Sequence, residues 1–112
     1  MKFLCLAFGD QAGWDSLTDD EKVEALAQDA VIRSRGATRS AVRPQVTSVR
    51  NWDKKLEVSK QPHVTGLPLA GFSIIEAGDI DEVVKLVANT PCARGKGVIE
   101  IRPFWDANVS AP

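Results

Sequence analysis

The sequence predicts an α+β domain of ferredoxin-like type, with the element order β-α-β-β-α-β and an inserted hairpin, and with two copies packed face to face as a dimer. Segments typical of strands and helices follow one another in that order along the chain. Two of the strand segments are apolar on both faces, which does not suit a strand with one face in water. The chain has 112 residues, enough for one hydrophobic core.

The first half of the chain begins with a strand and a helix. Residues Lys2 to Phe8 (KFLCLAF) are a continuous apolar run of strand length. Thr18, with Glu21 three residues later, has the pattern of a capping box, and Gly36 is a favourable helix end. We therefore expect a helix over about Thr18 to Arg35. Its core-facing stripe should consist of the apolar residues at helical spacing, namely Val23, Leu26, Ala27, Ala30 and Val31.

The middle of the chain has a weaker pattern. Residues Val46 to Arg50 and Lys55 to Val58 flank a turn-rich tetrapeptide, which predicts a hairpin. Leu69 to Ala77 (LAGFSIIEA) is the next expected strand, apolar on both faces. Asp79 and Glu82 have the spacing of a second capping box, so a second helix should begin there. We expect that helix to end at Asn89-Thr90-Pro91.

The last expected strand, Gly97 to Trp105, separates its residues between two faces. Ile99 and Ile101 should face the helices, whereas Glu100 and Arg102 should face the opposite side of the sheet. With both helices on one face, the other face would expose a larger apolar patch than monomers normally carry. We therefore expect a homodimer, in which the same sheet of a second copy covers this face and a central cavity lies between them.

Composition and charge exclude several functions. The chain has 14 basic and 15 acidic residues, a net charge of −1, so we expect neither a nucleic-acid nor a membrane partner. Cys5 and Cys92 are not spaced as a CxxC pair and there is one histidine, which argues against a zinc site; we expect no metal and no cofactor. No secretory or membrane-spanning run is present, which indicates a cytoplasmic location and free thiols. We expect one domain over residues 1–106 and a tail over 107–112.

Three stretches resemble the YCII-related family, in its DGPF-type branch: MKFLCLAFGD, AGFSIIEAGDIDEVVKLVANTPCARGKG and VIEIRPFW. The clearest pieces are the Gly71-Phe72 strand that leads into Asp79, Asp81 and Glu82, and the Glu100-x-Arg102-Pro103 end. The resemblance implies a dimeric α+β barrel of ferredoxin-like subunits. Most members have no assigned function, and some relatives are thought to act on small organic acids or lactones.

The chain departs from the motif that names this branch. Asp-Gly-Pro-Phe falls on Lys60-Gln61-Pro62-His63, so only the proline is retained. The aspartate is the residue suspected of being the general base in this family, and Lys60 stands in its place. We therefore do not transfer the proton chemistry of the relatives to this chain.

Three residues are candidates for acid–base catalysis. His63 has the one side chain whose ordinary pKa lies near neutrality, and it stands in the segment of the altered motif. Asp10, at the end of the first strand, or Glu100, on the uncovered face, would be its partner. Each has a plainer interpretation: a solvated loop histidine, a turn aspartate and one half of an ion pair.

Three more residues are candidates for ligand binding. Arg102 would hold an anionic group on the uncovered face, and Lys60 is a second cation for that role. Trp14 would line a flat pocket, although large aromatic residues more often fill a core or an interface.

Two functions follow from these candidates. The first is a cofactor-independent enzyme that acts on a small anionic organic molecule by proton transfer, in isomerase or lyase chemistry. The second is a non-catalytic dimeric module that has lost the family's aspartate and binds a metabolite or another protein. The sequence leaves both open.

Overall fold

The computed structural model describes residues 1–105, and the expected tail at 107–112 lies outside the described residues. Helices and strands follow one another in an order that contains the predicted β-α-β-β-α-β series. The elements are β1 (Lys2–Phe8), α1 (Gln11–Asp15), α2 (Asp19–Ser34), β2 (Thr38–Ala41), β3 (Ser48–Arg50), the short 3-10 helix η1 (Trp52–Lys54), β4 (Glu57–Ser59), β5 (Leu69–Glu76), α3 (Ile80–Val87), α4 (Pro91–Arg94) and β6 (Val98–Pro103).

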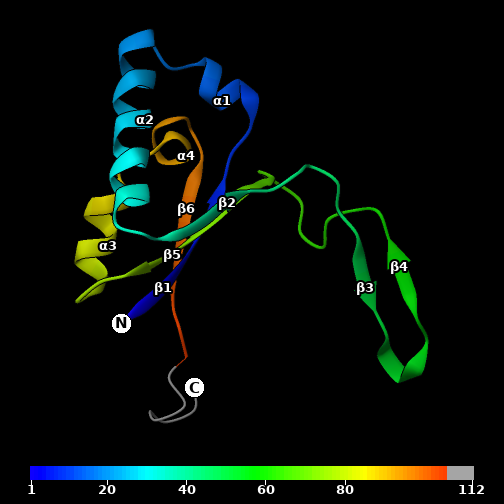
Figure 1. Ribbon diagram of the computed structural model, residues 1–112. Coiled ribbons are helices and arrows are strands. Elements are labelled where there is room, and N and C mark those ends of the chain that lie inside the picture. The colour runs from blue at the N-terminus through cyan, green and yellow to red at the C-terminus, as the bar shows by residue number, and fades with distance from the viewer. Residues whose placement is uncertain (106–112) are drawn as a thin grey trace.

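A four-stranded sheet in the order β2-β5-β1-β6 forms the centre of the fold, and all its neighbouring strands are antiparallel. Helices α2 and α3 lie on one face of this sheet (Figure 1). Strands β3 and β4 form a separate two-stranded sheet, inserted between β2 and β5. The predicted ferredoxin-like α+β class and its inserted hairpin are therefore confirmed.

The two long helices begin at the residues that the sequence indicates. The Thr18 side chain accepts a hydrogen bond from the Glu21 backbone N–H at 3.2 Å, and the Glu21 carboxylate accepts one from the Thr18 N–H at 2.9 Å. This is the predicted capping box of α2. At α3, Asp79 caps the Glu82 N–H at 2.9 Å, but the Glu82 carboxylate accepts from the Gly78 N–H instead. The second capping box is therefore only half formed.

The core-facing side of α2 differs from the prediction. Ala25 and Ile32 are its buried residues, whereas Val23, Leu26 and Val31 of the expected stripe are exposed. Polar contacts hold the helix in this rotation. Gln28 Nε2 donates to the Leu86 carbonyl at 2.7 Å, and the Asp29 carboxylate lies 2.7 Å from Arg39 of β2. The small Ala25 side chain, with no exposed area, suits this close approach.

Three short elements were not predicted. Helix α1 has five residues and β2 has four, of sequence Thr-Arg-Ser-Ala, so neither contains a long enough apolar pattern to be recognised. Pro91, expected to end the second helix region, instead occupies the first turn of α4. Proline is compatible with that position because the first N–H groups of a helix have no helical partner.

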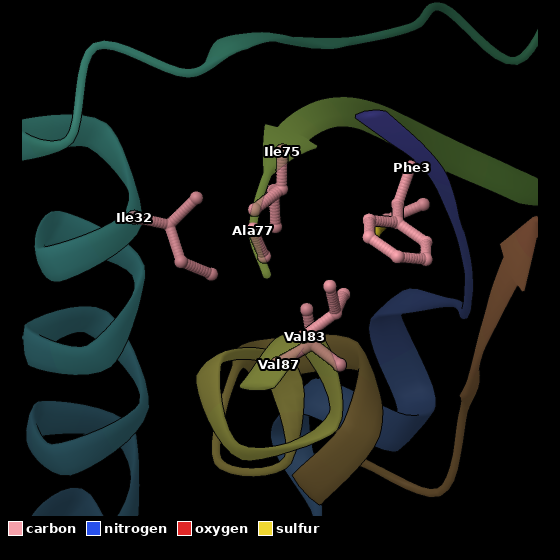
Figure 2. Close-up of a cluster of buried hydrophobic side chains, with 7 residues drawn as sticks. Phe3, Ile32, Ile75, Ala77, Val83 and Val87 are labelled. Atoms are coloured by element: carbon pink, nitrogen blue, oxygen red, sulfur yellow. The ribbon is translucent and has the colours of Figure 1, made fainter. Parts of the chain in front are cut away.

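The hydrophobic core lies between the sheet and the two long helices. Phe3 and Ile75 of neighbouring strands are each 1% exposed, and Val83 of α3 is fully buried. Figure 2 shows Ile32 of α2 and Val87 of α3 pointing toward these strand residues. The core therefore fills the space at one end of the helix-covered face.

The inserted hairpin extends away from the helices (Figure 1). Val49 of β3 pairs with Val58 of β4, and both side chains are exposed. Trp52 at the turn is 71% exposed, and Arg50 lies 4.5 Å above its ring. An isolated two-stranded hairpin is only marginally stable in water. Few contacts of its own therefore stabilise this segment.

Candidate functional site

The uncovered face of the four-stranded sheet has an apolar centre. Leu4 and Leu6 of β1 pair with Ile74 and Phe72 of β5, and all four side chains are partly exposed. They alternate with the buried Phe3 and Ile75 along the same strands. We call these four residues and their β6 neighbours the open face, because no other described residue packs over them as the helices do over the opposite face.

Glu100 and Arg102 lie on the open face, at the β6 edge. Their strand partners in β1 are Leu6 and Leu4, so the pair stands beside the apolar centre. Arg102 Nη2 donates to Glu100 Oε1 at 2.8 Å. The side chains are 63% and 44% exposed, so the ion pair is open to solvent in one chain. An exposed pair of this kind contributes little to stability, which leaves both groups available to a ligand.

Asp10 and Trp14 lie at α1, at the other end of β1. Asp10 is the N-cap of α1, and its carboxylate accepts from the Gly13 N–H at 2.9 Å. The Trp14 ring is partly buried, with Lys22 Nζ 5.7 Å from its centroid. Capping is therefore the role that the structure gives Asp10 within one chain.

Lys60 and His63 lie in the exposed segment that follows β4. Lys60 Nζ donates to Thr47 Oγ1 at 3.1 Å, and His63 and Pro62 line a hollow along the hairpin. The six residues that the sequence singles out thus fall in three places: the open face, the α1 cap and the hairpin. Among residues 1–105, Glu100 and Arg102 are the one pair of the six whose side chains form an ion pair or hydrogen bond with each other, whereas Asp10 and Trp14 share a backbone hydrogen bond within α1.

The helix-covered face contains a cavity that the sequence analysis missed. It has a volume of about 150 Å³ and lies beneath α2 and α4, next to the core. Its floor is a row of small residues across three strands, in which Ala41 pairs with Gly71 and Gly71 with Ala7. Ala7 and Ala41 carry only a methyl group, and Gly71 carries no side chain because the β2 backbone approaches it closely, so no long side chain rises from this floor toward the helices.

An ion pair lies at this cavity. Arg39 Nη1 is 2.7 Å from Asp29 Oδ2 and also donates to the Asp29 carbonyl at 3.2 Å. The two side chains are 26% and 18% exposed, so this pair is more shielded than the one on the open face. Arg33 lies 3.8 Å from the same carboxylate but is largely exposed.

Both cysteines of the chain line the cavity as free thiols. Burial raises the pKa of the Cys5 thiol, and a hydrogen bond with Ser73 partly offsets this. Burial also raises the pKa of Cys92, and the negative charge of Asp29 adds to the increase. Both thiols therefore stay protonated at neutral pH and add no charge to the cavity.

A pattern in the sequence could have indicated this cavity. The residues of β1 that face the helices decrease in size in the order Phe3, Cys5, Ala7. The paired positions of β5 decrease in the same direction, from Ile75 through Ser73 to Gly71. When the side chains of two neighbouring strands become smaller in the same direction, they leave a gap beneath helices that stay at the same distance from the sheet.

The described residues show neither a metal site nor a membrane span. No group of three or more His, Cys, Asp or Glu side chains within residues 1–105 could hold a metal ion. Over the same residues, no helix has the length and apolar character needed to cross a bilayer.

Comparison with known proteins identifies a shared fold. No protein-family model matches the chain, and no curated protein matches it. A solved structure with a similar fold is 5-chloro-2-hydroxyhydroquinone dehydrochlorinase (TftG) from Burkholderia phenoliruptrix AC1100, in complex with 2,5-dihydroxybenzoquinone. The two are 15% identical, with a TM-score of 0.50 over 96% of this chain and 97% of that one. The chain therefore shares its α+β fold with this structure.

Proposed function

We propose that two copies of the chain pack open face against open face and enclose a chamber that binds a small anionic organic molecule. In this chamber the protein carries out proton transfer without a cofactor, as an isomerase or lyase. One observation carries the proposal: the open face combines an uncovered apolar centre with the Glu100–Arg102 pair at its edge.

The apolar centre is the reason to expect a second copy. Leu4, Leu6, Phe72 and Ile74 form one contiguous patch across two strands. Burial of such side chains stabilises a complex by about 25 cal/mol per Å² of apolar surface. A two-fold axis would place each patch against the same patch of the partner, which is the usual form of a homodimer interface.

The ion pair is the reason to expect an anionic ligand. An incoming carboxylate or enolate would compete with Glu100 for the Arg102 guanidinium, which can bind such groups through two N–H donors. The displaced Glu100 carboxylate would then stand beside the ligand as a proton acceptor. In a chamber with little water, both interactions would be stronger than on the exposed surface.

The other predicted site residues could lie near the chamber only in the dimer. His63 and Lys60 are on the hairpin that extends away from the helix layer (Figure 1). They would reach the chamber if the hairpin of one copy crosses to the other. Asp10 and Trp14 would then remain at the rim, with Asp10 acting as a helix cap.

The dehydrochlorinase of similar fold supports the substrate class. Its name describes loss of HCl from a chlorinated hydroxyhydroquinone, and its ligand is a single oxygenated ring. Elimination of this kind needs a group that accepts a proton and a group that stabilises the developing oxyanion. Glu100 and Arg102 are of the right types for these two roles.

A second candidate function is binding without catalysis. The dispersal of His63, Asp10 and Glu100 over three places in one chain favours it, because general acid–base catalysis needs such groups within reach of one substrate. The replacement of the motif's aspartate by Lys60 agrees with this alternative.

The test combines native mass spectrometry with ligand titration, using 2,5-dihydroxybenzoquinone as the probe and chloride release from 5-chloro-2-hydroxyhydroquinone as the assay. We expect a wild-type dimer that Leu6→Glu converts to a monomer. Arg102→Met should weaken probe binding at least tenfold, whereas Arg33→Met, on the outer surface of α2, should not. A monomeric wild type, or probe binding that Arg102→Met leaves unchanged, would contradict the proposal.

Catalysis and binding are separated by two further variants. Glu100→Gln should abolish chloride release and preserve probe binding if Glu100 accepts the proton. His63→Ala should do the same if the hairpin histidine takes part. Tight probe binding with no chloride release by the wild type would favour the binding module.

A further inference from the structure

The cavity beneath α2 and α4 is separated from the open face by the sheet itself. Its floor residue Ala7 lies on the helix-covered side of β1, whereas Leu6 and Phe8 lie on the other side. Among the residues that line the cavity, Phe72 also belongs to the open face, so the variants that separate the two sites are made at Ala7 and Arg102, which each belong to one side. The two sites can be altered independently.

The size of the cavity suits one six-membered ring. Its volume is about 150 Å³. An engineered apolar cavity of about this volume in another protein stays dry and takes up benzene. Ile32, Val87 and Ile99 supply apolar walls. The two neutral thiols behave as small apolar groups, so most of the lining has little affinity for water.

The polar end of the cavity holds groups of opposite charge. Asp29 and Arg39 pair at 2.7 Å, so their charges largely cancel, and the more exposed Arg33 lies 3.8 Å from the same carboxylate. Arg39 uses Nη1 for both of its contacts, and within residues 1–105 its Nε and Nη2 groups have no hydrogen-bond partner. Free N–H donors and a carboxylate thus lie side by side at a partly shielded position.

This combination selects a hydroxyl group over a charged one. A hydroxyl can accept from the Arg39 N–H and donate to the Asp29 carboxylate at the same time. A carboxylate on the ligand could accept from Arg39 but would be repelled by Asp29, because these partly shielded side chains are screened less than groups in open solvent. A ring without a polar group would leave the pair's hydrogen-bonding capacity unused.

We propose that this cavity is a second binding site, which takes a neutral single-ring aromatic molecule with a hydroxyl group, of the phenol class. The ring lies over the floor formed by Ala7, Gly71 and Ala41, and the hydroxyl meets Asp29 and Arg39. Occupation of the site adds packing contacts between the sheet and α2, so it also stabilises the fold.

Three probes built on one benzene ring test the proposal in calorimetric titrations and in NMR amide-shift mapping: phenol, benzene and benzoate. We expect phenol to bind at least tenfold more tightly than either of the others. The shifted amides should be those of Cys5, Ala7, Gly71 and Ser73. Tighter binding of benzoate than of phenol, shifts confined to the open face, or no binding of any probe at millimolar concentration would overturn the proposal.

Three variants test where the probes bind and whether the Asp29–Arg39 pair selects among them. Ala7→Leu fills the floor and should abolish binding of all three probes, and Cys92→Leu, at the α4 wall, gives a second filled variant should Ala7→Leu fail to fold. Asp29→Asn leaves the charge of Arg39 unopposed, so the preference should shift from phenol to benzoate by at least tenfold. An unchanged preference would show that the pair does not select the ligand.

Arg102→Met is the matched control on the open face. It should leave phenol binding unchanged, just as Ala7→Leu should leave the binding of 2,5-dihydroxybenzoquinone in the proposed chamber unchanged. Loss of phenol binding in both variants would show that the two sites are one, and would contradict this inference without deciding the proposed function.

Discussion

The two faces of the four-stranded sheet are made of alternating residues of the same strands, yet they differ in how they are covered. Phe3 is 1% exposed beneath the helices, and its neighbour Leu4 is partly exposed on the open face. An arginine–carboxylate pair that includes a strand arginine also lies on each face, Asp29–Arg39 under α2 and Glu100–Arg102 on β6. Hydrophobic content alone therefore does not determine where the core forms, because the position of the helices decides which face is closed.

The largest expected difference in stability between the two faces comes from truncating Phe3 and Leu4, which are neighbours in β1. Phe3→Ala should lower the free energy of unfolding by about 3–5 kcal/mol, because it empties the centre of the core. Leu4→Ala should cost about 1–2 kcal/mol in a monomer, since part of that side chain is already in water. Urea unfolding followed by circular dichroism measures both.

The open-face variant also distinguishes a monomer from a dimer. If two open faces pack together, the cost of Leu4→Ala should increase with protein concentration, because association is then part of the stability. The cost of Phe3→Ala should not change in this way. If Phe3→Ala and Leu4→Ala lower the free energy of unfolding equally at every protein concentration, the two faces are covered alike, which contradicts this prediction.

The sequence was sufficient to predict the long elements. β1, α2, β5, α3 and β6 begin and end within about two residues of the expected positions, because each carries a clear apolar period or a capping side chain. β2 could not be recognised from Thr-Arg-Ser-Ala, since its place in the sheet depends on pairing with β5. The rotation of α2 was also hidden, because Gln28 and Asp29 set it through partners outside the helix, Leu86 of α3 and Arg39 of β2.

The candidate sites were less predictable than the fold. Alternation along β6 was enough to place Glu100 and Arg102 on one face. The positions of His63 and Lys60 depend on where an inserted hairpin points, and no local pattern encodes that direction. The cavity is defined by missing side chains at Ala7 and Gly71, whereas a search for functional residues looks for reactive groups that are present.

The second-largest effect should come from the cavity floor. In Gly71→Ala the new Cβ would lie 2.7 Å from the Ser40 carbonyl oxygen, which belongs to the backbone of β2 and cannot rotate away. We expect a loss of about 1–3 kcal/mol as β2 shifts from β5. Thermal unfolding measures it, and Ala70→Gly, next along β5, tests for a general effect at this strand. An unchanged melting temperature for Gly71→Ala would show that β2 is free to move.

The two ion pairs should differ by a smaller amount. Arg39→Met leaves the partly shielded Asp29 with only the exposed Arg33 nearby, and should cost about 1–2 kcal/mol, between the values for exposed and buried pairs. Arg102→Met on the open face should cost less than about 1 kcal/mol. Parallel urea titrations at low and high salt measure both. A larger loss for Arg102→Met would indicate that its pair is buried in an assembly.

The smallest effect concerns the helix layer that closes one face. Hydrogen bonds from the Thr18 backbone N–H and side chain, with a smaller contribution from Arg94, lower the pKa of the Glu21 carboxyl. A carboxyl with a lower pKa in the folded state stabilises the fold above its unfolded pKa, and this contribution is lost as the pH falls below about 4. Glu21→Gln keeps a capping side chain but removes the titrating group. Stability of the wild type should therefore decrease more steeply than that of Glu21→Gln between about pH 5 and pH 3, as measured by thermal unfolding. Parallel curves of stability against pH for the wild type and Glu21→Gln would show that ionisation of Glu21 in the capping box does not stabilise α2. The helix layer on the closed face would then be held by packing alone.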